Sequence, residues 1–191
     1  MRKIIVSTLV TLDGVIEDPS GIGGSPNAGW ASPYFNAEAA QRSLDHLSEC
    51  DYFLCGRRTY EMFAKQWPNG SGPYADRMNS IPKLVASTTL SGELSWNATL
   101  LGTDAIASLK KIKEQPGRDI MMYGSPTLMS SLLRHGLVDR LDLLVFPIVV
   151  GAGQRMFTED GPKVKLNLVS QDELSTGAAV LSYQPMGRIE R

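Results

Sequence analysis

The chain has 191 residues, which fits one domain by the usual range of about 100–200 residues per domain. Nineteen basic and twenty acidic residues give a net charge of −1, so the whole surface is unsuited to nucleic acid or an anionic membrane. No apolar run reaches the ~20 residues of a membrane-spanning helix. Cys50 and Cys55 lack histidines at zinc-ligand spacing. We therefore expect one cytoplasmic domain over residues 1–191, with reduced thiols and no metal site.

The amino-terminal quarter is predicted to form a strand, a long loop and a helix. Residues 4–10 are mostly apolar and β-branched, which is typical of a strand covered on both faces, and a turn at 12–16 follows. The loop at 19–33 is rich in glycine and serine and carries Trp30. Loops of that length inside compact domains are usually functional or disordered. Asn36 can then cap a helix that runs to about residue 49.

A strand, a tight turn and a helix come next, and their junction is rich in donors. The apolar run 52–55 ends at Gly56, and Arg57 and Arg58 precede a helix with Thr59 in its first turn. A helix start offers unpaired backbone N–H groups and the positive end of a dipole, which suits phosphate. Arginines add bidentate positive charge, although they could equally be solvated. The pattern favours a phosphorylated ligand such as a nucleotide.

The middle of the chain is predicted to add a second hydroxyl-rich strand end. A short helix at 74–81 precedes a strand at 83–87, and the hydroxyl residues Ser87, Thr88 and Thr89 stand at its end. Another short strand is predicted at 98–101. The following helix is capped by Thr103 or Asp104 and runs through residue 113.

A second strand-turn-helix unit then repeats the logic of the first. Residues 119–123 predict a strand and Gly124 makes the turn. Ser125 is a good N-cap and Pro126 suits the first helical position. Apolar residues line one face of this helix, and Gly136 ends it. Two such turns make phosphate binding a stronger hypothesis than either turn alone.

The carboxyl-terminal part is predicted to consist of strands. A long apolar strand at 140–150 is broken by Pro147 and runs into the loop 151–153, and the segments 164–169 and 178–183 form a closing antiparallel pair. Strands alternating with helices, followed by strands alone, predict an α/β fold with a mostly parallel sheet and antiparallel C-terminal strands. Ligands of such sheets bind beyond the carboxyl ends of the parallel strands. Neither a GxGxxG nor a P-loop motif is present.

Four segments together resemble a known family: residues 11–16, 56–61, 123–126 and 146–153. They are similar to the dihydrofolate reductase fold and, within it, to the reductase domain of the bifunctional riboflavin-pathway deaminase/reductase. The resemblance implies a three-layer α/β fold, a homodimer and an NADPH-dependent reductase. Such an enzyme transfers hydride to a small heterocyclic or carbonyl substrate, as 5-amino-6-(5-phosphoribosylamino)uracil reductase does. A dinucleotide-binding module without turnover, with a regulatory role, is the alternative.

The resemblance also implies a set of site residues. The expected cofactor-binding residues are Thr8, Ile16, Gly56, Arg57, Arg58, Thr59, Ser87, Thr88, Tyr123, Gly124, Ser125 and Thr127. The expected substrate-binding residues are Trp30, Glu38, Gly151 and Gly153, and either Asp13 or a water is expected to supply the proton. Two departures are visible. Dihydrofolate reductases carry a Gly-Gly pair where this chain has Gly124-Ser125, and only Glu38 offers a carboxylate near the place of their folate-binding acid, so folate activity is not expected.

Several of these residues also suit plain structural roles. Asp13 is equally suited to stabilising a turn with Gly14, and Glu38 to favouring a helix start through the dipole. Trp30 can serve as a loop anchor as readily as a platform for substrate. We predict that the loop 19–33 is a lid over the nicotinamide end of the cofactor, because its glycines leave the backbone free to move.

Overall fold

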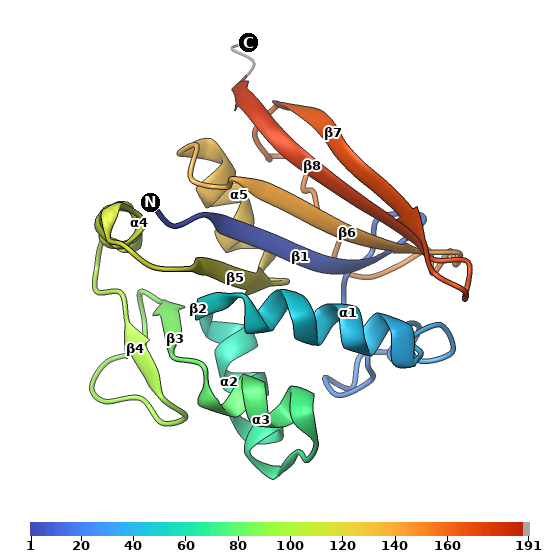
Figure 1. Cartoon of the computed structure of the whole chain (residues 1–191), viewed down its shortest axis with the longest axis horizontal. Coiled ribbons are helices and arrows are strands. Elements are labelled where there is room, and N and C mark those ends of the chain that lie inside the picture. Colours follow the sequence, from blue (N-terminus) through green and yellow to red (C-terminus); the bar gives the residue numbers. More distant parts are fainter. Residues whose placement is uncertain (189–191) are drawn as a thin grey trace.

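The computed structural model describes residues 1–188, which form one eight-stranded sheet with helices on both faces (Figure 1). The strands are β1 (Ile4–Thr11), β2 (Cys50–Gly56), β3 (Lys83–Ala86), β4 (Ala98–Leu100), β5 (Asp119–Tyr123), β6 (Arg140–Phe146), β7 (Val164–Glu173) and β8 (Ala179–Arg188). Their order across the sheet is β4-β3-β2-β5-β1-β6-β8-β7. The strands from β4 to β6 run parallel, whereas β8 and β7 are antiparallel. The predicted fold class is confirmed.

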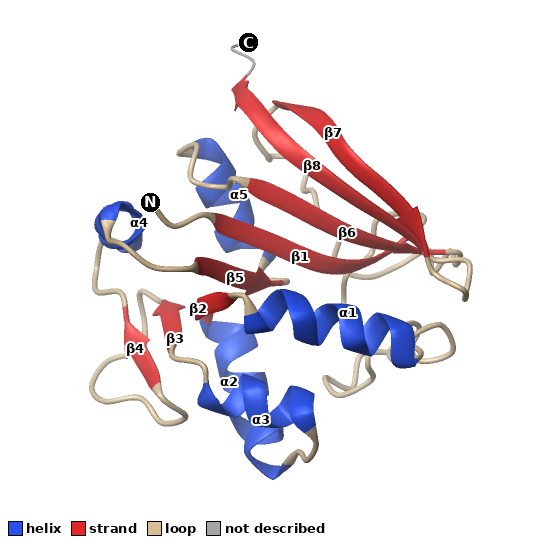
Figure 2. Ribbon diagram, viewed as in Figure 1, coloured by secondary structure: helices blue, strands red, loops and turns tan. Residues whose placement is uncertain are grey.

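The helices separate into two layers (Figure 2). They are α1 (Ala37–Ser48), α2 (Arg57–Gln66), α3 (Pro73–Ser80), α4 (Ala105–Glu114) and α5 (Pro126–Arg134), with a 3-10 turn η1 (Trp67–Asn69) after α2. Buried residues of α1, α2 and α3 pack on one face of the sheet, and those of α4 and α5 pack on the other. The predicted caps Asn36 and Asp104 each accept a hydrogen bond from the third residue of the helix that follows. None of the described helices is long and apolar enough to cross a membrane.

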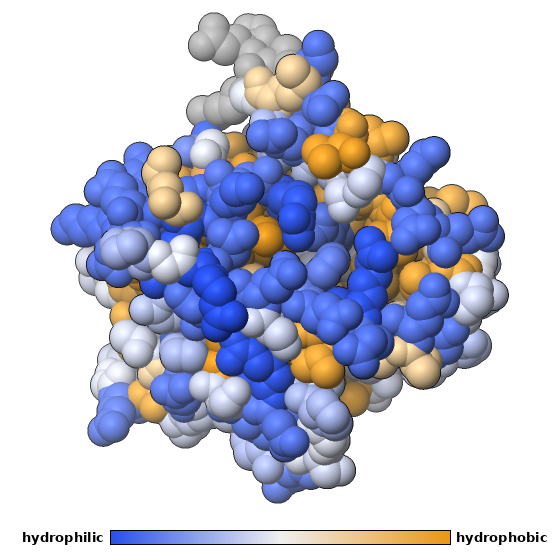
Figure 3. Space-filling view, in the orientation of Figure 1, coloured by the Kyte–Doolittle hydropathy of each residue, from blue (hydrophilic) through white to orange (hydrophobic). Residues whose placement is uncertain are grey.

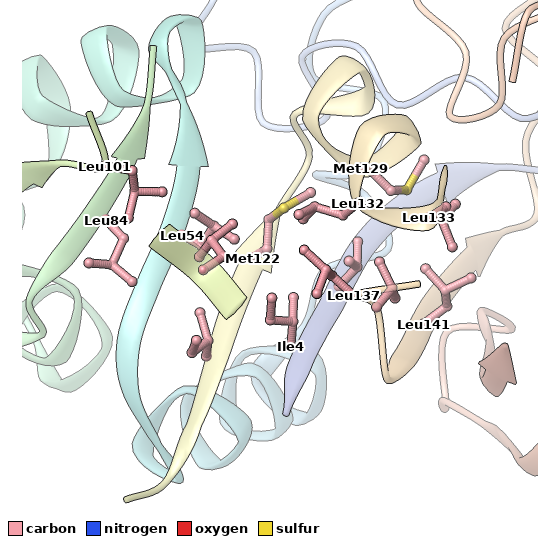
Figure 4. Packing of buried hydrophobic residues seen from close by; sticks show 14 of the residues in the cluster. Ile4, Leu54, Leu84, Leu101, Met122, Met129, Leu132, Leu133, Leu137 and Leu141 are labelled. Atoms are coloured by element: carbon pink, nitrogen blue, oxygen red, sulfur yellow. The ribbon is translucent and has the colours of Figure 1, made fainter. Parts of the chain in front are cut away.

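Strand residues divide between the two helix layers by simple alternation. Ile4 of β1 and Met122 of β5 point to the α5 side, where they pack with Leu132 (Figure 4). The neighbouring residues Ile5 and Met121 belong to the cluster on the opposite face. Successive strand side chains point to opposite faces, so a sheet covered on both sides needs continuous apolar runs. Each such buried side chain contributes about 1.5–3 kcal/mol.

The carboxyl-terminal strands differ in length from the prediction. β6 ends at Phe146 instead of continuing to residue 150, because Pro147 has no N–H to donate to the ladder. β7 and β8 are each ten residues long and form an extended antiparallel hairpin. β7 is an edge strand whose side chains are mostly exposed, so it lacks the apolar alternation that would have revealed its length. Hydrophobic surface lies over this hairpin (Figure 3), where Leu168, Val169 and Met186 are exposed.

Candidate functional site

A groove of about 540 Å³ lies beyond the carboxyl ends of β2, β3, β4 and β5, at the starts of α2 and α5. The lining residues with polar side chains are Arg57, Arg58, Thr59, Ser87, Thr88, Thr89, Thr103, Ser125, Thr127, Ser131 and Gln154. The lining includes two arginines and neither aspartate nor glutamate. Of the twelve expected cofactor residues, it contains Gly56, Arg57, Arg58, Thr59, Ser87, Thr88, Ser125 and Thr127.

The start of α2 forms the cationic wall of the groove. Gly56 is the N-cap residue and offers no side-chain capping bond, so the first N–H groups of the helix have no side-chain acceptor there. Arg57 and Arg58 occupy the first helical positions and are exposed. The guanidinium of Arg57 lies 3.3 Å from both carboxylate oxygens of Glu61. Arg58 has no ion-pair partner among residues 1–188, which leaves its charge available.

The start of α5 forms the facing wall and is built from two left-handed residues. Gly124 has φ +55° and Ser125 has φ +51° and ψ +57°. Ser125 is the N-cap residue of α5, as predicted, but its side chain makes no capping bond. Its left-handed backbone instead directs the hydroxyl across the groove, where Oγ accepts from the Gly56 N–H at 3.0 Å and lies 2.8 Å from Thr59 Oγ1.

The end of β3 supplies hydroxyl groups with two different roles. Ser87 Oγ accepts from the backbone N–H groups of Thr89 and Leu90 at 3.1 and 3.0 Å, so it organises the turn. Thr88, between Ser87 and Thr89 in the sequence, is exposed in the groove. The groove therefore contains three hydroxyls at this strand end: those of Ser87 and Thr89 lie 3.4 Å apart, and that of Thr88 has no hydrogen-bond partner among the described residues.

Some groove residues were not predicted as ligands. Gly102 and Thr103 follow β4, and they could have been found by extending the strand-end rule to that strand. Ser131 lies one turn into α5, on the helix face toward the groove. Gln154 comes from the loop after β6, and no sequence pattern indicates that this loop reaches the groove.

The loop after β1 holds Asp13 in a network of three hydrogen bonds. Its carboxylate accepts from the Thr11 hydroxyl at 2.6 Å and from the N–H groups of Val150 and Gly151 at 3.2 and 2.9 Å. The Thr11 hydrogen bond, supported by those two backbone bonds, lowers the pKa of Asp13 to about 2. The side chain is therefore ionised at neutral pH. Asp13 as the proton source stays a prediction, and the lowered pKa means that its carboxylate would first have to take up a proton.

The RibD C-terminal domain family matches residues 2–180 of this chain. The chain belongs to the RibD C-terminal domain family. Protein YyaP of Bacillus subtilis (strain 168) is 27% identical over 187 residues, covering 95% of this chain and 94% of YyaP. A structure from Shewanella sp. PV-4 has a TM-score of 0.67 and 21% identity, covering 96% of this chain and 98% of that one. A pyrimidine reductase-like protein of Corynebacterium diphtheriae has a TM-score of 0.64 and 15% identity, covering 97% and 92%. These two likenesses show the fold.

Within this RibD C-terminal domain fold, the loop 19–33 is anchored in the core. Trp30 is 5% exposed, its indole N–H donates to the Glu17 carbonyl at 2.8 Å, and its ring meets Phe146 edge to face at 5.7 Å. Asn27 donates to the Ala152 carbonyl at 3.1 Å, which ties the loop to the segment after β6. Of the two roles considered for Trp30, the structure supports the anchor. The lid stays a prediction, and movement would be confined to the part before Trp30.

The remaining expected residues do not line the groove themselves. Glu38 sits in the first turn of α1, where its carboxylate accepts from the Ser175 hydroxyl and N–H, and these bonds lower its pKa. Gly153 faces Val15, leaving no room for a side chain, and Gly151 donates to Asp13. The others are Thr8, which is buried in β1, Ile16, which packs on the α5-side core, Tyr123, which packs against Phe53, and Gly124, which joins β5 to Ser125.

The part of the chain that the structure describes contains no evident metal-binding site. No group of three or more His, Cys, Asp or Glu side chains is arranged there to hold an ion. Both cysteines are buried free thiols, and burial raises the pKa of each to about 12.

Proposed function

We propose that this RibD C-terminal domain protein binds NADPH in the groove and acts as a reductase. The observation that carries the proposal is the composition of the groove wall: two arginines, several hydroxyls and two helix starts, without a carboxylate. Pyrophosphate and a 2′-phosphate are anions that such groups bind by charge-assisted hydrogen bonds. A lining acid would repel them. Membership of the RibD C-terminal domain family supports the same reading.

The groove residues divide naturally over the parts of a dinucleotide. The starts of α2 and α5 would hold the pyrophosphate beside the Thr59–Ser125 hydrogen bond that joins them. Arg58 and Thr88 would hold the 2′-phosphate, and Arg57 would assist once its bond to Glu61 loosens. Ala86, Ala105 and Leu128 provide apolar lining suited to the adenine face. Gln154, from the loop after β6, would contact the part of the dinucleotide that leaves the groove toward the loops after β1 and β6.

NADPH, when bound, supplies the hydride, so the protein mainly has to bind, orient and exclude water. The loops after β1 and β6 are joined by backbone hydrogen bonds, including Ile16 N–H to the Gln154 carbonyl at 2.9 Å. We place the substrate, a small heterocycle or carbonyl compound, beside these loops. Because Asp13 is ionised, a water molecule is the proton source that fits the proposal.

A second candidate is an NADP(H)-binding module without turnover. One observation favours it, namely that the Asp13 carboxylate accepts three hydrogen bonds and has a lowered pKa. The two candidates differ in one measurable property. A reductase oxidises NADPH when mixed with a panel of pyrimidine, pteridine and carbonyl compounds, whereas a binding module leaves NADPH unchanged against every compound.

The binding proposal is tested by titrating NADPH and NADH into the wild-type protein, Arg58→Ala and Arg57→Ala. We expect the wild type to prefer NADPH, and Arg58→Ala to lose about tenfold in NADPH affinity with little change for NADH. Arg57→Ala, the matched control, should lose less, because its guanidinium is shared with Glu61. Equal losses for both nucleotides in Arg58→Ala would refute the 2′-phosphate assignment.

We also propose a homodimer, in a cytoplasmic setting consistent with two reduced thiols. The apolar residues of β6 are not the contact surface, because this strand lies between β1 and β8 and its Leu141, Leu144 and Phe146 are buried. The β7–β8 hairpin supports the proposal instead, since it exposes Leu168 and Val169 on an edge strand. A purely monomeric mass by light scattering across micromolar concentrations would contradict it.

A further inference from the structure

Two groups from the start of α2 meet at one oxygen atom from the start of α5. Ser125 Oγ accepts from the Gly56 N–H at 3.0 Å and lies 2.8 Å from Thr59 Oγ1. Gly56 and Thr59 belong to the start of α2, whereas Ser125 stands before α5. These contacts are the only hydrogen bonds that the two hydroxyls make within residues 1–188. A single side chain thus joins the two walls of the groove.

The Thr59–Ser125 pair has one more hydroxyl hydrogen than its mutual bond uses. A serine or threonine hydroxyl has one hydrogen to donate and two lone pairs to accept with. Thr59 and Ser125 together carry two hydroxyl hydrogens, and their mutual bond uses one of them. Whichever residue donates, one hydroxyl hydrogen stays unused, and both residues line the groove.

The second bond at Ser125 decides which hydroxyl is the better donor. Its oxygen already accepts the Gly56 N–H. If Thr59 also donates to it, both lone pairs of Ser125 Oγ are used, and its own O–H is polarised by two incoming bonds. An anion in the groove favours this direction, because it places a proton toward the negative charge. Thr59 cannot reach the same state, since its hydroxyl has no other donor among the described residues.

We propose that the Ser125 hydroxyl is a relay donor to a phosphate oxygen of the bound ligand, and that Thr59 positions it. This rests on the proposed function for the identity of the ligand, NADPH. The relay gives the groove a donor aimed at an anion before the ligand arrives. It also gives the serine a role that glycine, the residue of the dihydrofolate reductases at this turn, cannot fill.

The backbone of Ser125 makes a clean test possible. Its φ of +51° and ψ of +57° lie in the left-handed region, which glycine adopts without steric cost. Ser125→Gly removes the hydroxyl and relieves the left-handed backbone, which offsets the two lost hydrogen bonds, so the melting temperature should change little. We expect this variant to bind NADPH, and inorganic pyrophosphate as a minimal probe, roughly tenfold more weakly than the wild type in calorimetric titrations.

Thr59 is tested through its dependence on Ser125. Thr59→Val removes the hydroxyl at nearly constant shape and should weaken NADPH binding by about threefold. Thr59→Ser keeps the hydroxyl and should bind like the wild type. The double variant Ser125→Gly/Thr59→Val should bind like Ser125→Gly alone, because a positioning residue has no effect once its target is gone. A purely structural role for Thr59 would instead give a full additional loss in the double variant.

The two probes separate this inference from the proposed function. Wild-type protein that binds pyrophosphate but not NADPH would contradict the proposed function. The pyrophosphate titrations of the wild type and Ser125→Gly would still test whether the Ser125 hydroxyl is a relay donor. Ser125→Gly that binds pyrophosphate as tightly as the wild type, or more tightly, would overturn the relay and show that Ser125 only covers the Gly56 N–H. Wild-type protein that binds neither probe would overturn both.

Discussion

The groove and the loops at the ends of β1 and β6 lie along the same edge of the sheet. They differ in whether their polar groups find hydrogen-bond partners within the protein. In the groove, Arg58 and Thr88 are exposed without a partner among the described residues. In the β1–β6 loops, residues 11–17 and 147–156, the polar groups bond to one another. The difference teaches where to look for a ligand. A site that receives an anion keeps free donors, whereas a scaffold satisfies its own.

The β1–β6 loops are held by a dense set of internal bonds. Val15 pairs with Arg155 in a β-bridge, and Leu12 N–H donates to the Ile148 carbonyl at 2.9 Å. Asp13 accepts from both loops, and the Arg155 guanidinium donates to its carbonyl oxygen. We therefore expect changes in these loops to alter stability, and changes in the groove to alter nucleotide affinity.

The largest effect is expected for Trp30→Ala. Removing a buried tryptophan typically costs about 3–5 kcal/mol of unfolding free energy, because it leaves a cavity beside Phe146. NADPH affinity of the folded fraction should stay unchanged. Urea unfolding measures the loss, and Trp30→Phe, which keeps an aromatic ring but loses the bond to Glu17, serves as the control. A stable Trp30→Ala variant with impaired turnover would instead indicate that Trp30 contacts the substrate.

Asp13 is expected to give a pH-dependent effect on stability. Its pKa of about 2 is below the unfolded value of about 3.9. A depressed pKa stabilises the fold above the unfolded pKa, and this contribution disappears as the pH falls from about 4 toward 2. Asp13→Asn should lower the melting temperature at pH 7, and the difference from the wild type should shrink toward pH 2. A difference that is equal at pH 7 and pH 2 would show that the charge of Asp13 is irrelevant.

The smallest effect is expected for Thr88→Val in the groove. The exposed hydroxyl has no internal partner within residues 1–188, so its loss should leave the unfolding free energy unchanged within about 0.5 kcal/mol. NADPH affinity should fall by about 0.5–1.5 kcal/mol, the net value of one hydrogen bond. Ser87→Ala is the matched control, since Ser87 supports the turn through Thr89 and Leu90 and should affect stability as well. A lower unfolding free energy in Thr88→Val would show that Thr88 has a structural role.

Much of the fold could be predicted from the sequence because the parallel strands carry continuous apolar runs and the helices carry recognisable caps. Asn36 caps α1 as predicted, and Asp104, one of the two candidates, caps α4. The extent of β7 could not be predicted, since an exposed edge strand has no hydrophobic period. The end of β6 was misplaced because apolar residues continue past Pro147.

The candidate site was predicted in part for a similar reason. Strand-end turns such as Gly56–Thr59 are local in sequence, so residues and spacing suffice to find them. The roles of Asp13 and Trp30 depend on partners more than a hundred residues away, Gly151 and Phe146, and composition cannot reveal such partners. Ser125 shows the same limit, because its hydroxyl turns away from its own helix to Gly56.

The central claim, that the groove holds the phosphates of NADPH, is tested most directly by a crystal structure of the complex with NADP⁺. We expect the pyrophosphate between the starts of α2 and α5, within hydrogen-bond distance of Ser125 Oγ. The 2′-phosphate should lie against Arg58 and Thr88. A nucleotide bound outside the groove, or a 2′-phosphate remote from Arg58, would contradict the account.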